Sequence, residues 1–270
     1  MHIVRKSKLL YQNMTTSVFI TPAQTILKQV SKHLNYRMEE YCIKKFDSTV
    51  TPNSLNIIDE EYYIYFEMDY LKGGDLMNYI QLRNYKPYFD NGLVLPEQSN
   101  SNTFTEKNKV ILKLMINLLT KLRDESIIHL DVKPENFVFT DKTHTDLRII
   151  DFGSAQTYNF ETKDSFTLSQ IIGTPFYIPP EYYLDNTIHY NSDIWSLGIT
   201  LLVLETGKNI FDKNTNYELA LLENQQDLDD TIDKYIKVDT DSNNLIKNML
   251  KLDCSIRFDY DDILTHSYLN

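Results

Sequence analysis

The chain has 270 residues, of which 42% are hydrophobic and 24% are charged, so it can bury a core large enough for one or two lobes. Its formal net charge of −11 at pH 7 argues against general binding to nucleic acid or to an anionic membrane, because both need a basic face. Only two cysteines occur, so a disulfide framework is not expected, and no cluster of cysteine and histidine has the spacing of a zinc site.

No targeting segment is apparent in the sequence. The first residues, MHIVRK, lack the apolar core of a signal peptide, and the longest apolar run, residues 194–204, is too short to span a bilayer and reads as a buried helix. We therefore expect an intracellular protein, in the cytoplasm or the nucleus, with neither a nucleic-acid nor a membrane partner. The sequence does not indicate an oligomeric state.

The first 70 residues are expected to form a strand, a long helix and a pair of strands. Residues 1–12 read as a short strand with a basic end. Thr21 and Pro22 offer a capping hydroxyl and a proline at the first helical position, and apolar residues recur near the helical period as far as Phe46. This predicts a helix over residues 21–46. A turn at residues 54–58 then leads to paired strands, of which residues 62–70 are rich in β-prone side chains.

The next segments predict mainly helices and loops. Residues 84–105 are rich in Asn, Ser, Pro and Gly and are expected to be a loop insertion between two helices. Residues 106–124 are strongly helical, with a broad face of Leu, Ile, Val and Met. A stripe of this kind indicates core packing and not a cofactor site.

Residues 127–139, IIHLDVKPENFVF, place a polar loop between two apolar, β-prone ends. The apolar ends predict a loop clamped at both sides, which leaves Asp131, Lys133 and Asn136 facing a cleft. A plain turn between two short strands is the alternative, because Asp, Pro and Asn also favour turns.

A second apolar run, residues 147–150, ends in Asp151-Phe152-Gly153. An acid again leaves a strand and enters a flexible turn, so Asp131, Asn136 and Asp151 offer three oxygen-bearing side chains from two neighbouring turns. Hard divalent cations prefer oxygen ligands, and Mg²⁺ is usually held by one or two carboxylates together with substrate phosphates.

The motif HLDVKPEN, followed fifteen residues after its Asn by Asp-Phe-Gly, resembles the catalytic and metal-binding loops of eukaryotic protein kinases. The resemblance implies that Asp131 accepts the proton of the substrate hydroxyl and that Lys133 steadies the γ-phosphate. It also implies that Asn136 and Asp151 hold Mg²⁺, with ATP as the phosphoryl donor.

The same resemblance extends toward the N-terminus. The segment IVRK, residues 3–6, is similar to the strand whose lysine reaches the ATP phosphates, which makes Lys6 the candidate, with Lys8 as the second choice and an ordinary basic terminus as the alternative. Glu39 resembles the helical partner of that lysine, or is a solvated helix acid like Glu40. The family places two strands and a Gly-rich loop before the lysine, whereas this chain has no glycine before Gly73, so we expect a truncated small lobe.

Residues 68–76 resemble the hinge between the two kinase lobes. Met68 takes the gatekeeper position, and residues from Asp69 to Leu71 would offer backbone contacts to adenine. Asp75 would lie near the ribose or near a basic side chain of the substrate. A simple exit from a hairpin is the alternative.

Residues 151–181 resemble the activation segment, and GTPFYIPPE, residues 173–181, resembles the substrate-docking loop. Lys133 and Thr174 match the serine/threonine-type signature, in which Thr174 bridges Asp131 and Lys133, so we expect a protein substrate with Ser or Thr. The family usually has Arg after the loop histidine, to pair with a phosphate on the activation segment, and here Leu130 stands there.

Two further pairs are implied by the resemblance. Arg257 in LDCSIR, residues 252–257, would pair with Glu181 and hold the docking loop, and Asp193 would anchor the backbone of the catalytic loop from a buried helix. Within the family the hinge and the KPEN motif are most similar to the calmodulin-dependent group.

The resemblance implies an α+β, two-lobed fold, with residues 1–70 as a truncated small lobe of strands and one long helix and residues 71–270 as a mainly helical lobe. The expected function is that of a Ser/Thr protein kinase. Two alternatives stay open. The missing Gly-rich loop motivates a kinase-like scaffold with little turnover, and a small-molecule kinase is a minor option against which the docking-loop motif argues.

Overall fold

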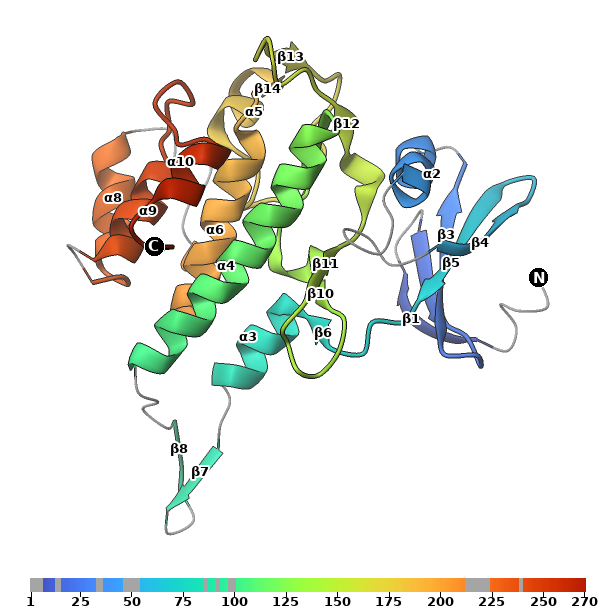
Figure 1. Ribbon diagram of the computed structural model, residues 1–270, viewed down its shortest axis with the longest axis horizontal. Coiled ribbons are helices and arrows are strands. Elements are labelled where there is room, and N and C mark those ends of the chain that lie inside the picture. The colour runs from blue at the N-terminus through green and yellow to red at the C-terminus, as the bar shows by residue number, and fades with distance from the viewer. Residues whose placement is uncertain are drawn as a thin grey trace. The chain divides into compact units, whose positions relative to one another are not determined.

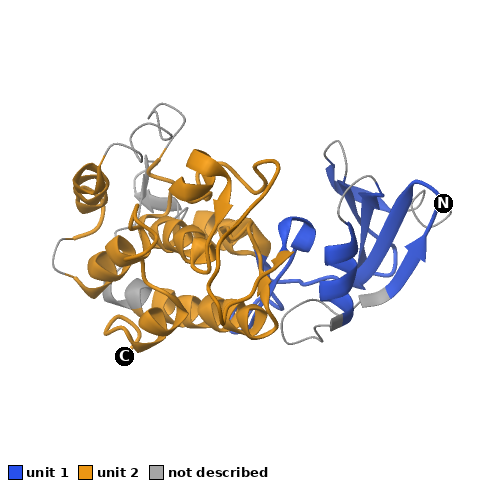
Figure 2. Ribbon diagram, turned by 90° about the horizontal axis from the view of Figure 1, so that it is seen from above, with its two compact units in different colours: residues 1–74, 137–155 blue, residues 75–136, 156–270 orange. Residues whose placement is uncertain are grey.

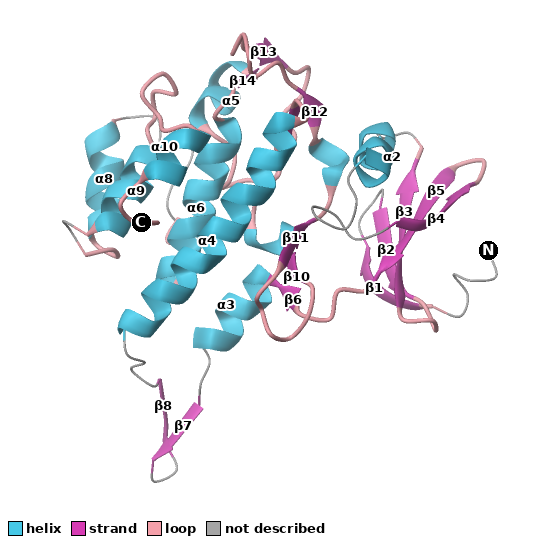
Figure 3. Cartoon of the chain, viewed as in Figure 1, coloured by secondary structure: helices cyan, strands magenta, loops and turns pink. Residues whose placement is uncertain are grey.

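The structure is a computed structural model that describes residues 7–12, 16–32, 36–45, 54–84, 87–90, 93–96, 101–211, 224–237 and 240–270. The chain forms two compact units, residues 1–74 with 137–155 and residues 75–136 with 156–270 (Figure 2). The first unit is built mainly of strands and the second mainly of helices (Figure 3). An α+β fold with a small antiparallel sheet and a helical part is therefore confirmed.

Unit 1 contains a five-stranded antiparallel sheet in the order β1-β2-β3-β5-β4 (Figure 1). Its strands are β1 (Lys8–Gln12), β2 (Thr16–Ile20), β3 (Thr25–Ser31), β4 (Ser54–Asp59) and β5 (Tyr63–Asp69). The unit also holds helix α2 (Tyr36–Lys45), the short strands β10 (Phe137–Phe139) and β11 (Leu147–Ile149), and the 3₁₀ turn η2 (Phe152–Ser154). Strand β6 (Gly74–Asp75) begins at the last residue of its first segment.

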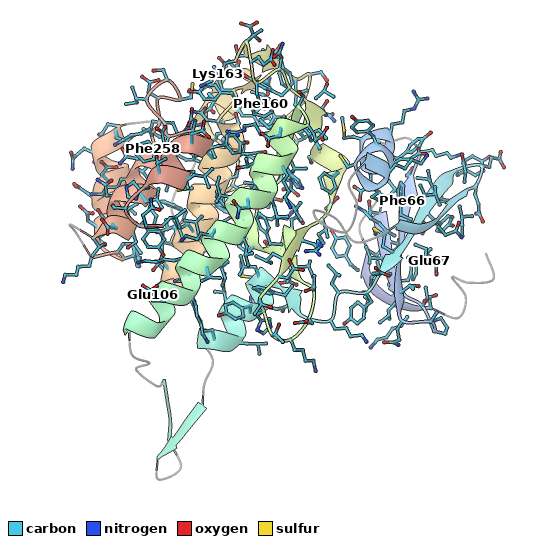
Figure 4. All side chains as sticks on the ribbon, in the orientation of Figure 1. Phe66, Glu67, Glu106, Phe160, Lys163 and Phe258 are labelled. Atoms are coloured by element: carbon cyan, nitrogen blue, oxygen red, sulfur yellow. The ribbon has the colours of Figure 1, made fainter. Side chains whose placement is uncertain are left out.

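The core of unit 1 lies between this sheet and α2. It is an apolar cluster from strands β3 and β5 and from α2, made of Val30, Ile43, Ile64, Phe66 and Met68. Phe66, labelled in Figure 4, lies opposite Lys28 in the register of β3 and β5. Strand β3 lies between β2 and β5, and its neighbouring residues Leu27 and Lys28, whose side chains point to opposite faces of the sheet, are both buried.

The predicted helix over residues 21–46 is wrong in its first half. Thr25–Ser31 is strand β3, and the helix spans only Tyr36–Lys45. The hydroxyl of Thr21 does not cap a helix, because it accepts a hydrogen bond from the Thr25 backbone N–H at 3.2 Å and so closes the turn between β2 and β3. Gln24 in this turn has φ of +62°, which favours a tight turn. Pairing with two neighbouring strands decided the conformation, because β-branched residues fit a sheet at least as well as a helix.

The expectation that the small lobe lacks the two strands that precede its lysine-bearing strand is wrong. Two strands, β1 and β2, precede β3, and β1 lies at an edge of the sheet. The sequence has no glycine in the stretch between β1 and β2, and residues 13–15 of that stretch lie outside the described residues.

Unit 2 is organised around its helices. These are α3 (Leu76–Asn84), α4 (Ser101–Asp124), α5 (Pro180–Asp185), α6 (Ser192–Thr206), α8 (Gln225–Asp233), α9 (Asp241–Met249) and α10 (Tyr260–Thr265). Its short strands are β7 (Pro87–Asp90), β8 (Leu93–Pro96), β9 (Ile127–Ile128), β12 (Gln156–Thr157), β13 (Phe166–Thr167) and β14 (Thr187–Ile188), and its 3₁₀ turn is η1 (Pro134–Asn136). Strands β12 and β9, β13 and β14, and β7 and β8 form antiparallel pairs.

The loop expected over residues 84–105 contains two regular elements. Strands β7 and β8 pair as a hairpin, and α4 begins at Ser101 instead of 106. Asn91-Gly92, between the two strands, is a strong hairpin signal that a composition argument does not register.

Helix α6 forms the centre of unit 2, between α4 and α9. Every residue from Ser192 to Leu204 is buried, which explains why this helix is apolar on all sides. Within the described part of the chain, no helix has the length and the apolar content needed to cross a membrane.

The division of the chain differs from the predicted boundary at residue 70. The first segment of unit 1 runs to Gly74, and residues 137–155 belong to unit 1 although they were expected in the helical lobe. Backbone hydrogen bonds from Lys72 N to Thr140 O and from Gly73 N to Phe139 O, both 3.1 Å, tie this later segment to the first one.

We predict that Gly198→Ala lowers the free energy of unfolding by about 1–3 kcal/mol through overpacking, despite the better helix propensity of alanine. A Cβ at this position of α6 would lie 2.8 Å from Leu250 Cδ2 and 3.0 Å from Met249 Cβ. Urea unfolding followed by the fluorescence of Trp195, the one tryptophan of the chain, measures the effect. If crowding is the cause, combining Gly198→Ala with Leu250→Ala costs less than the sum of the two changes, and additive losses would contradict it.

Candidate active site

The loop that follows β9 is held by a carboxylate from another element. Asp193, in the first turn of α6, accepts hydrogen bonds from the backbone N–H groups of His129 at 2.7 Å and Leu130 at 2.9 Å. The carboxylate is buried, and burial raises the pKa of Asp193, whereas His129 and the two N–H donors oppose that rise. The anchoring role expected for Asp193 is confirmed by these contacts.

This anchor matters because the loop backbone is in an unusual conformation. Leu130 has φ of +61°, a region that costs a non-glycine residue about 1–2 kcal/mol. The two hydrogen bonds to Asp193 hold the two peptide groups that precede the Cα of Leu130, and the N–H group after it, that of Asp131, donates to His129 Nδ1 at 3.3 Å. The following residue, Asp131, is thereby presented with its side chain in a fixed direction.

Asp131 is the centre of a compact polar network in unit 2. Its Oδ1 accepts a hydrogen bond from Thr174 Oγ1 at 2.6 Å, and its Oδ2 accepts from Lys133 Nζ at 2.8 Å. Lys133 Nζ also donates to Thr174 Oγ1 at 2.6 Å, which closes a triangle of three side chains. The bridge expected of Thr174 is therefore present in the structure.

Asn136, at the end of η1, adds a fourth member to this network. Its Nδ2 donates to the backbone oxygen of Asp131 at 2.7 Å and to Asp131 Oδ2 at 3.0 Å. Both donors of the amide are thus used, and the amide oxygen Oδ1 has no hydrogen bond to the residues that the structure describes. An unused oxygen in this place suits a cation ligand.

Thr174 reaches Asp131 because the backbone before it approaches the loop closely. Gly173 has φ of +98°, and a Cβ at this position would lie 2.6 Å from the backbone oxygen of Leu130. Only glycine fits both the conformation and the space. The backbone at residues 173–174 therefore lies directly against the loop that carries Leu130 and Asp131.

An apolar cluster holds the rest of the segment that follows Asp151. Leu130 is buried together with Ile128, Tyr158, Ile178, Tyr182 and Ile188. The hydroxyl of Tyr182 accepts from Ile172 N at 2.8 Å and donates to Gln170 O at 3.0 Å. The position where the family usually has Arg is thus part of a hydrophobic contact between the loop and this segment.

A buried ion pair closes the far end of the same segment. Arg257 Nη1 and Nη2 donate to Glu181 Oε1 and Oε2 at 2.7 and 2.8 Å, and the Arg257 side chain is 0% exposed. The guanidinium also donates through Nε to Lys251 O at 3.0 Å and lies over the Trp195 ring. The pair expected from the sequence is present.

Unit 1 contains a second charged network, centred on Lys28 of β3. Lys28 Nζ lies 3.0 Å from Glu39 Oε1 and 2.9 Å from Asp151 Oδ1. The lysine that pairs with Glu39 is therefore Lys28, whereas the sequence suggested Lys6, which lies outside the described residues. Lys8, the second choice, lies exposed on β1. The structure thus gives Glu39 a different partner from the expected one, and which lysine binds phosphate stays a prediction.

Burial and pairing act in opposite directions on this network. Burial by itself would lower the pKa of Lys28, but the charges of Asp151 and Glu39 outweigh it and raise the pKa above its ordinary value. Burial raises the pKa of Glu39, while the ammonium group of Lys28 opposes that rise. Because a buried charge without a partner is costly, the buried Lys28 and Glu39 stabilise each other, and the partly exposed Asp151 is a second partner of Lys28.

Asp151 differs from its two partners because its side chain is 47% exposed. Its backbone has φ of +66° and ψ of +74°, the left-handed region, directly before η2. This conformation turns the chain sharply after β11, and Phe152 is buried as the next residue. One carboxylate oxygen of Asp151 binds Lys28 while the group as a whole stays accessible to a ligand.

The residues predicted for the hinge lie in β5, just after it, or at the start of α3. Met68 is part of the unit 1 core, opposite Ile26, and Asp69 pairs with Thr25 at the end of β5. Leu71 is partly exposed just after this strand. Asp75 accepts hydrogen bonds from the backbone N–H and the amide of Asn78, so it caps α3. Contacts of these residues to a nucleotide stay a prediction.

The oxygen-bearing side chains fit a cation that takes its other ligands from a substrate. No group of three or more His, Cys, Asp or Glu that could hold a metal ion occurs in the described ranges. Mg²⁺ does not require such a cage, because one or two protein oxygens suffice when phosphates complete the shell. Each unit by itself offers an oxygen ligand of this kind: the partly exposed carboxylate of Asp151 in unit 1 and, in unit 2, Oδ1 of Asn136, which has no hydrogen bond to the described residues.

Lys28 is the functional residue that the sequence analysis missed. Apolar residues at 26, 27, 30 and 34 matched the helical period and hid it in a predicted helix. Three β-branched residues, Thr25, Ile26 and Val30, surround Lys28 and could have indicated a strand. A single lysine within a short β-branched run, eleven residues before Glu39, was the available signal.

Comparisons with known proteins cover nearly the whole chain. The family model described as "Protein kinase domain" matches residues 17–269. The serine/threonine-protein kinase atg1 of Dictyostelium discoideum is 28% identical over 90% of this chain and 33% of its own length. A probable serine/threonine-protein kinase of the same organism is 30% identical over 93% of this chain and 43% of its own length. Calcium-dependent protein kinase 3 of Plasmodium yoelii yoelii is 26% identical over 91% of this chain and 43% of its own length. The chain thus spans less than half the length of these relatives.

We predict that Arg257→Met destabilises unit 2 by about 3–5 kcal/mol, because it leaves the Glu181 carboxylate buried without its partner. Replacing both residues, as Arg257→Met with Glu181→Leu, should recover part of this loss. Urea unfolding of the single and double variants, followed by Trp195 fluorescence, measures both effects. A double variant less stable than Arg257→Met alone would show that the ion pair is not the origin of the loss.

Proposed function

Because the chain belongs to the protein kinase family, we propose that it transfers the γ-phosphoryl group of ATP to serine or threonine hydroxyl groups of proteins. The observation that carries this proposal is the closed triangle of Asp131, Lys133 and Thr174, with Asn136 bonded to the same carboxylate. A plain turn has no need for three side chains that converge on one acid. The relatives named as serine/threonine-protein kinases support the same substrate class.

Asp131 is the proposed proton acceptor. Its carboxylate is held in direction by Thr174, Lys133 and Asn136, so little reorganisation is needed when a substrate hydroxyl approaches. A positioned general base of this kind is typically worth about 10²–10⁴-fold in rate. Phosphoryl transfer depends mostly on such positioning and on charge stabilisation, because the protein forms no covalent bond to the phosphoryl group.

Two lysines supply the positive charge that the reaction requires. Lys133 lies in the Asp131 network and would stabilise charge on the transferred group. Lys28 would bind the non-transferred phosphates of ATP, with Glu39 holding its ammonium group in place. The raised pKa of Lys28 keeps this group fully charged at physiological pH.

Magnesium is the proposed metal. Asp151 and Asn136 are the residues that would hold it, and the ion would neutralise phosphate charge during transfer. Two observations support this assignment: the carboxylate of Asp151 is partly exposed, and Oδ1 of Asn136 accepts no hydrogen bond from the described residues.

A kinase-like scaffold with little turnover is the second candidate. One feature of the sequence favours it. The chain has no glycine before Gly73 and so no Gly-rich loop that could cover the phosphates. The intact Asp131 network argues against it, since a scaffold does not need a positioned proton acceptor. ATP with Mg²⁺ should raise the melting temperature of the protein, as any ligand of the folded state does. No shift at millimolar ATP would favour the scaffold.

We predict that Asp131→Asn lowers kcat for protein phosphorylation by about 10²–10⁴-fold while ATP still raises the melting temperature. Lys28→Met should remove activity and also reduce the ATP-dependent shift, because it deletes the proposed phosphate ligand. Lys6→Met is the matched control and should leave both readouts unchanged. Transfer of labelled phosphate from ATP to Ser- and Thr-containing peptides measures activity. Equal activity of wild type and Asp131→Asn would point to a contaminating kinase and overturn the proposed role.

We also predict that activity does not depend on phosphorylation of residues 151–181. Leu130 contacts this segment through the apolar cluster around Tyr182, so no phosphate is needed to hold it. A variant with Thr162, Ser165, Thr167 and Ser169 all changed to Ala should keep most of the wild-type activity. Tyr182→Phe, which removes the hydroxyl bonded to Ile172 and Gln170, is the positive control and should lower it. Loss of activity in the fourfold variant would contradict the prediction.

A further inference from the structure

Unit 2 contains an open groove that the proposed function does not use. Its volume is about 780 Å³, and it is lined by the C-terminal end of α4, residues 157–163, the start of α10 and Tyr190. None of the four residues of the Asp131 network lines it. Two of its residues, Phe160 and Lys163, are labelled at the end of the helical unit that also carries β13 (Figures 1 and 4). The volume lies within the range of about 300–1,000 Å³ that is typical of ligand sites.

One side of the groove is aromatic. The rings of Tyr158 and Phe160 lie 4.8 Å apart, and the ring of Phe160 meets that of Tyr260 edge-on at 6.0 Å. Tyr190 adds a fourth ring. The hydroxyl of Tyr158 is buried and makes no hydrogen bond with any residue of the described ranges. Tyr158 and Tyr260 are buried, at 3% and 2% exposed, so the ring surface that the groove offers comes from the partly buried Phe160 and Tyr190. Exposed ring surface of this kind attracts both apolar groups and cations.

The groove already holds two cations of its own chain in this manner. Lys163 Nζ lies 4.2 Å from the centre of the Tyr190 ring and 3.4 Å from Asp259 Oδ2. Arg123 Cζ lies 5.2 Å from the centre of the Tyr260 ring, and its guanidinium pairs with Asp124 and Asp261. Each cation therefore combines an aromatic face with a carboxylate, which is a chemistry that a ligand cation can share.

Negative charge remains in excess after these pairs form. The lining contains four carboxylates, of Asp124, Glu161, Asp259 and Asp261, against the two cations Arg123 and Lys163, which leaves an excess of two negative charges. Asp259 and Asp262 form the capping box of α10, so part of this acidity has a structural reason. Glu161 has no such reason, because it is exposed and its carboxylate has no partner in the described part of the chain.

We propose that this groove docks a basic segment of a partner protein, with an arginine or lysine side chain on the aromatic wall and the carboxylates of Glu161 and Asp124 as its counter-charges. Charge complementarity selects this occupant, because the carboxylates of the lining outnumber its cations by two, so that a basic segment is attracted and an acidic one is repelled. The inference is independent of the proposed function, since no residue of the Asp131 network takes part.

The probe is a short fluorescein-labelled peptide of alternating arginine and alanine, which has no hydroxyl group and so is not a phosphoryl acceptor. Its glutamate–alanine counterpart is the control peptide. Binding to the whole chain is followed by fluorescence anisotropy at physiological salt, where attraction over long distances is screened. We expect saturable binding of the arginine peptide and none of the glutamate peptide.

Three variants locate the binding site. Asp124→Asn with Glu161→Gln removes two groove charges and should weaken binding by about fivefold, the scale of one to two exposed ion pairs. Glu106→Gln with Asp230→Asn removes the same charge outside the groove, and Glu106 lies toward the opposite end of α4 (Figure 4), so binding should not change. Glu135→Gln tests the acid that interacts with Asp131 and should also have no effect. Thermal melting confirms that each variant is folded.

The other outcomes overturn the proposal. Equal losses in the two double variants would mean that the peptide responds only to the overall charge of −11. A loss confined to Glu135→Gln would place the peptide beside the Asp131 network instead of in the groove. The absence of saturable binding to the wild-type chain would show that the groove is a solvated acidic surface.

Discussion

The carboxylate of Asp193 is the contact on which the candidate site depends most. It lies inside unit 2, at the start of a helix that is buried on all sides, and it accepts hydrogen bonds from the two backbone N–H groups that lead into the strained backbone of Leu130. A polar loop cannot keep one conformation in a buried setting unless its backbone donors are satisfied. Through Leu130 and Gly173 this single anchor also sets the distance between Asp131 and Thr174, because the backbones at these two residues touch.

Each unit carries a network in which charge is buried and compensated. In unit 1 the ammonium group of Lys28 pairs with two carboxylates, and in unit 2 the carboxylate of Asp131 accepts hydrogen bonds from three side chains. Removal of one member of such a set costs free energy, because the buried groups that remain lose one of the partners that compensate their charge. The contacts in the two networks fix the direction of each charged group. Fixed directions are what the positioning of a phosphoryl donor and a hydroxyl acceptor requires.

Sequence reasoning succeeded where the chemistry lies in contiguous residues. The stretch around Asp131, the turn at Asp151 and the pair of Glu181 with Arg257 were all named from local motifs. It failed where two conformations share one pattern. Residues 25–31 match the helical period as well as a strand, and only pairing with β2 and β5 settles the choice. The hairpin at residues 87–96 was overlooked for the opposite reason, because its composition resembles a loop while its turn signal is two residues long.

The sequence by itself determined the family, the identity of the acid and amide groups and the bridging threonine, because these depend on residue types at short, invariant spacings along the chain. Only the tertiary structure decided which lysine meets Glu39, where the small sheet begins and that Leu130 belongs to an apolar contact. The physical reason is that strand register brings together residues that are distant or ambiguous in the chain, and a shift of one residue would turn Lys28 to the other face of the sheet.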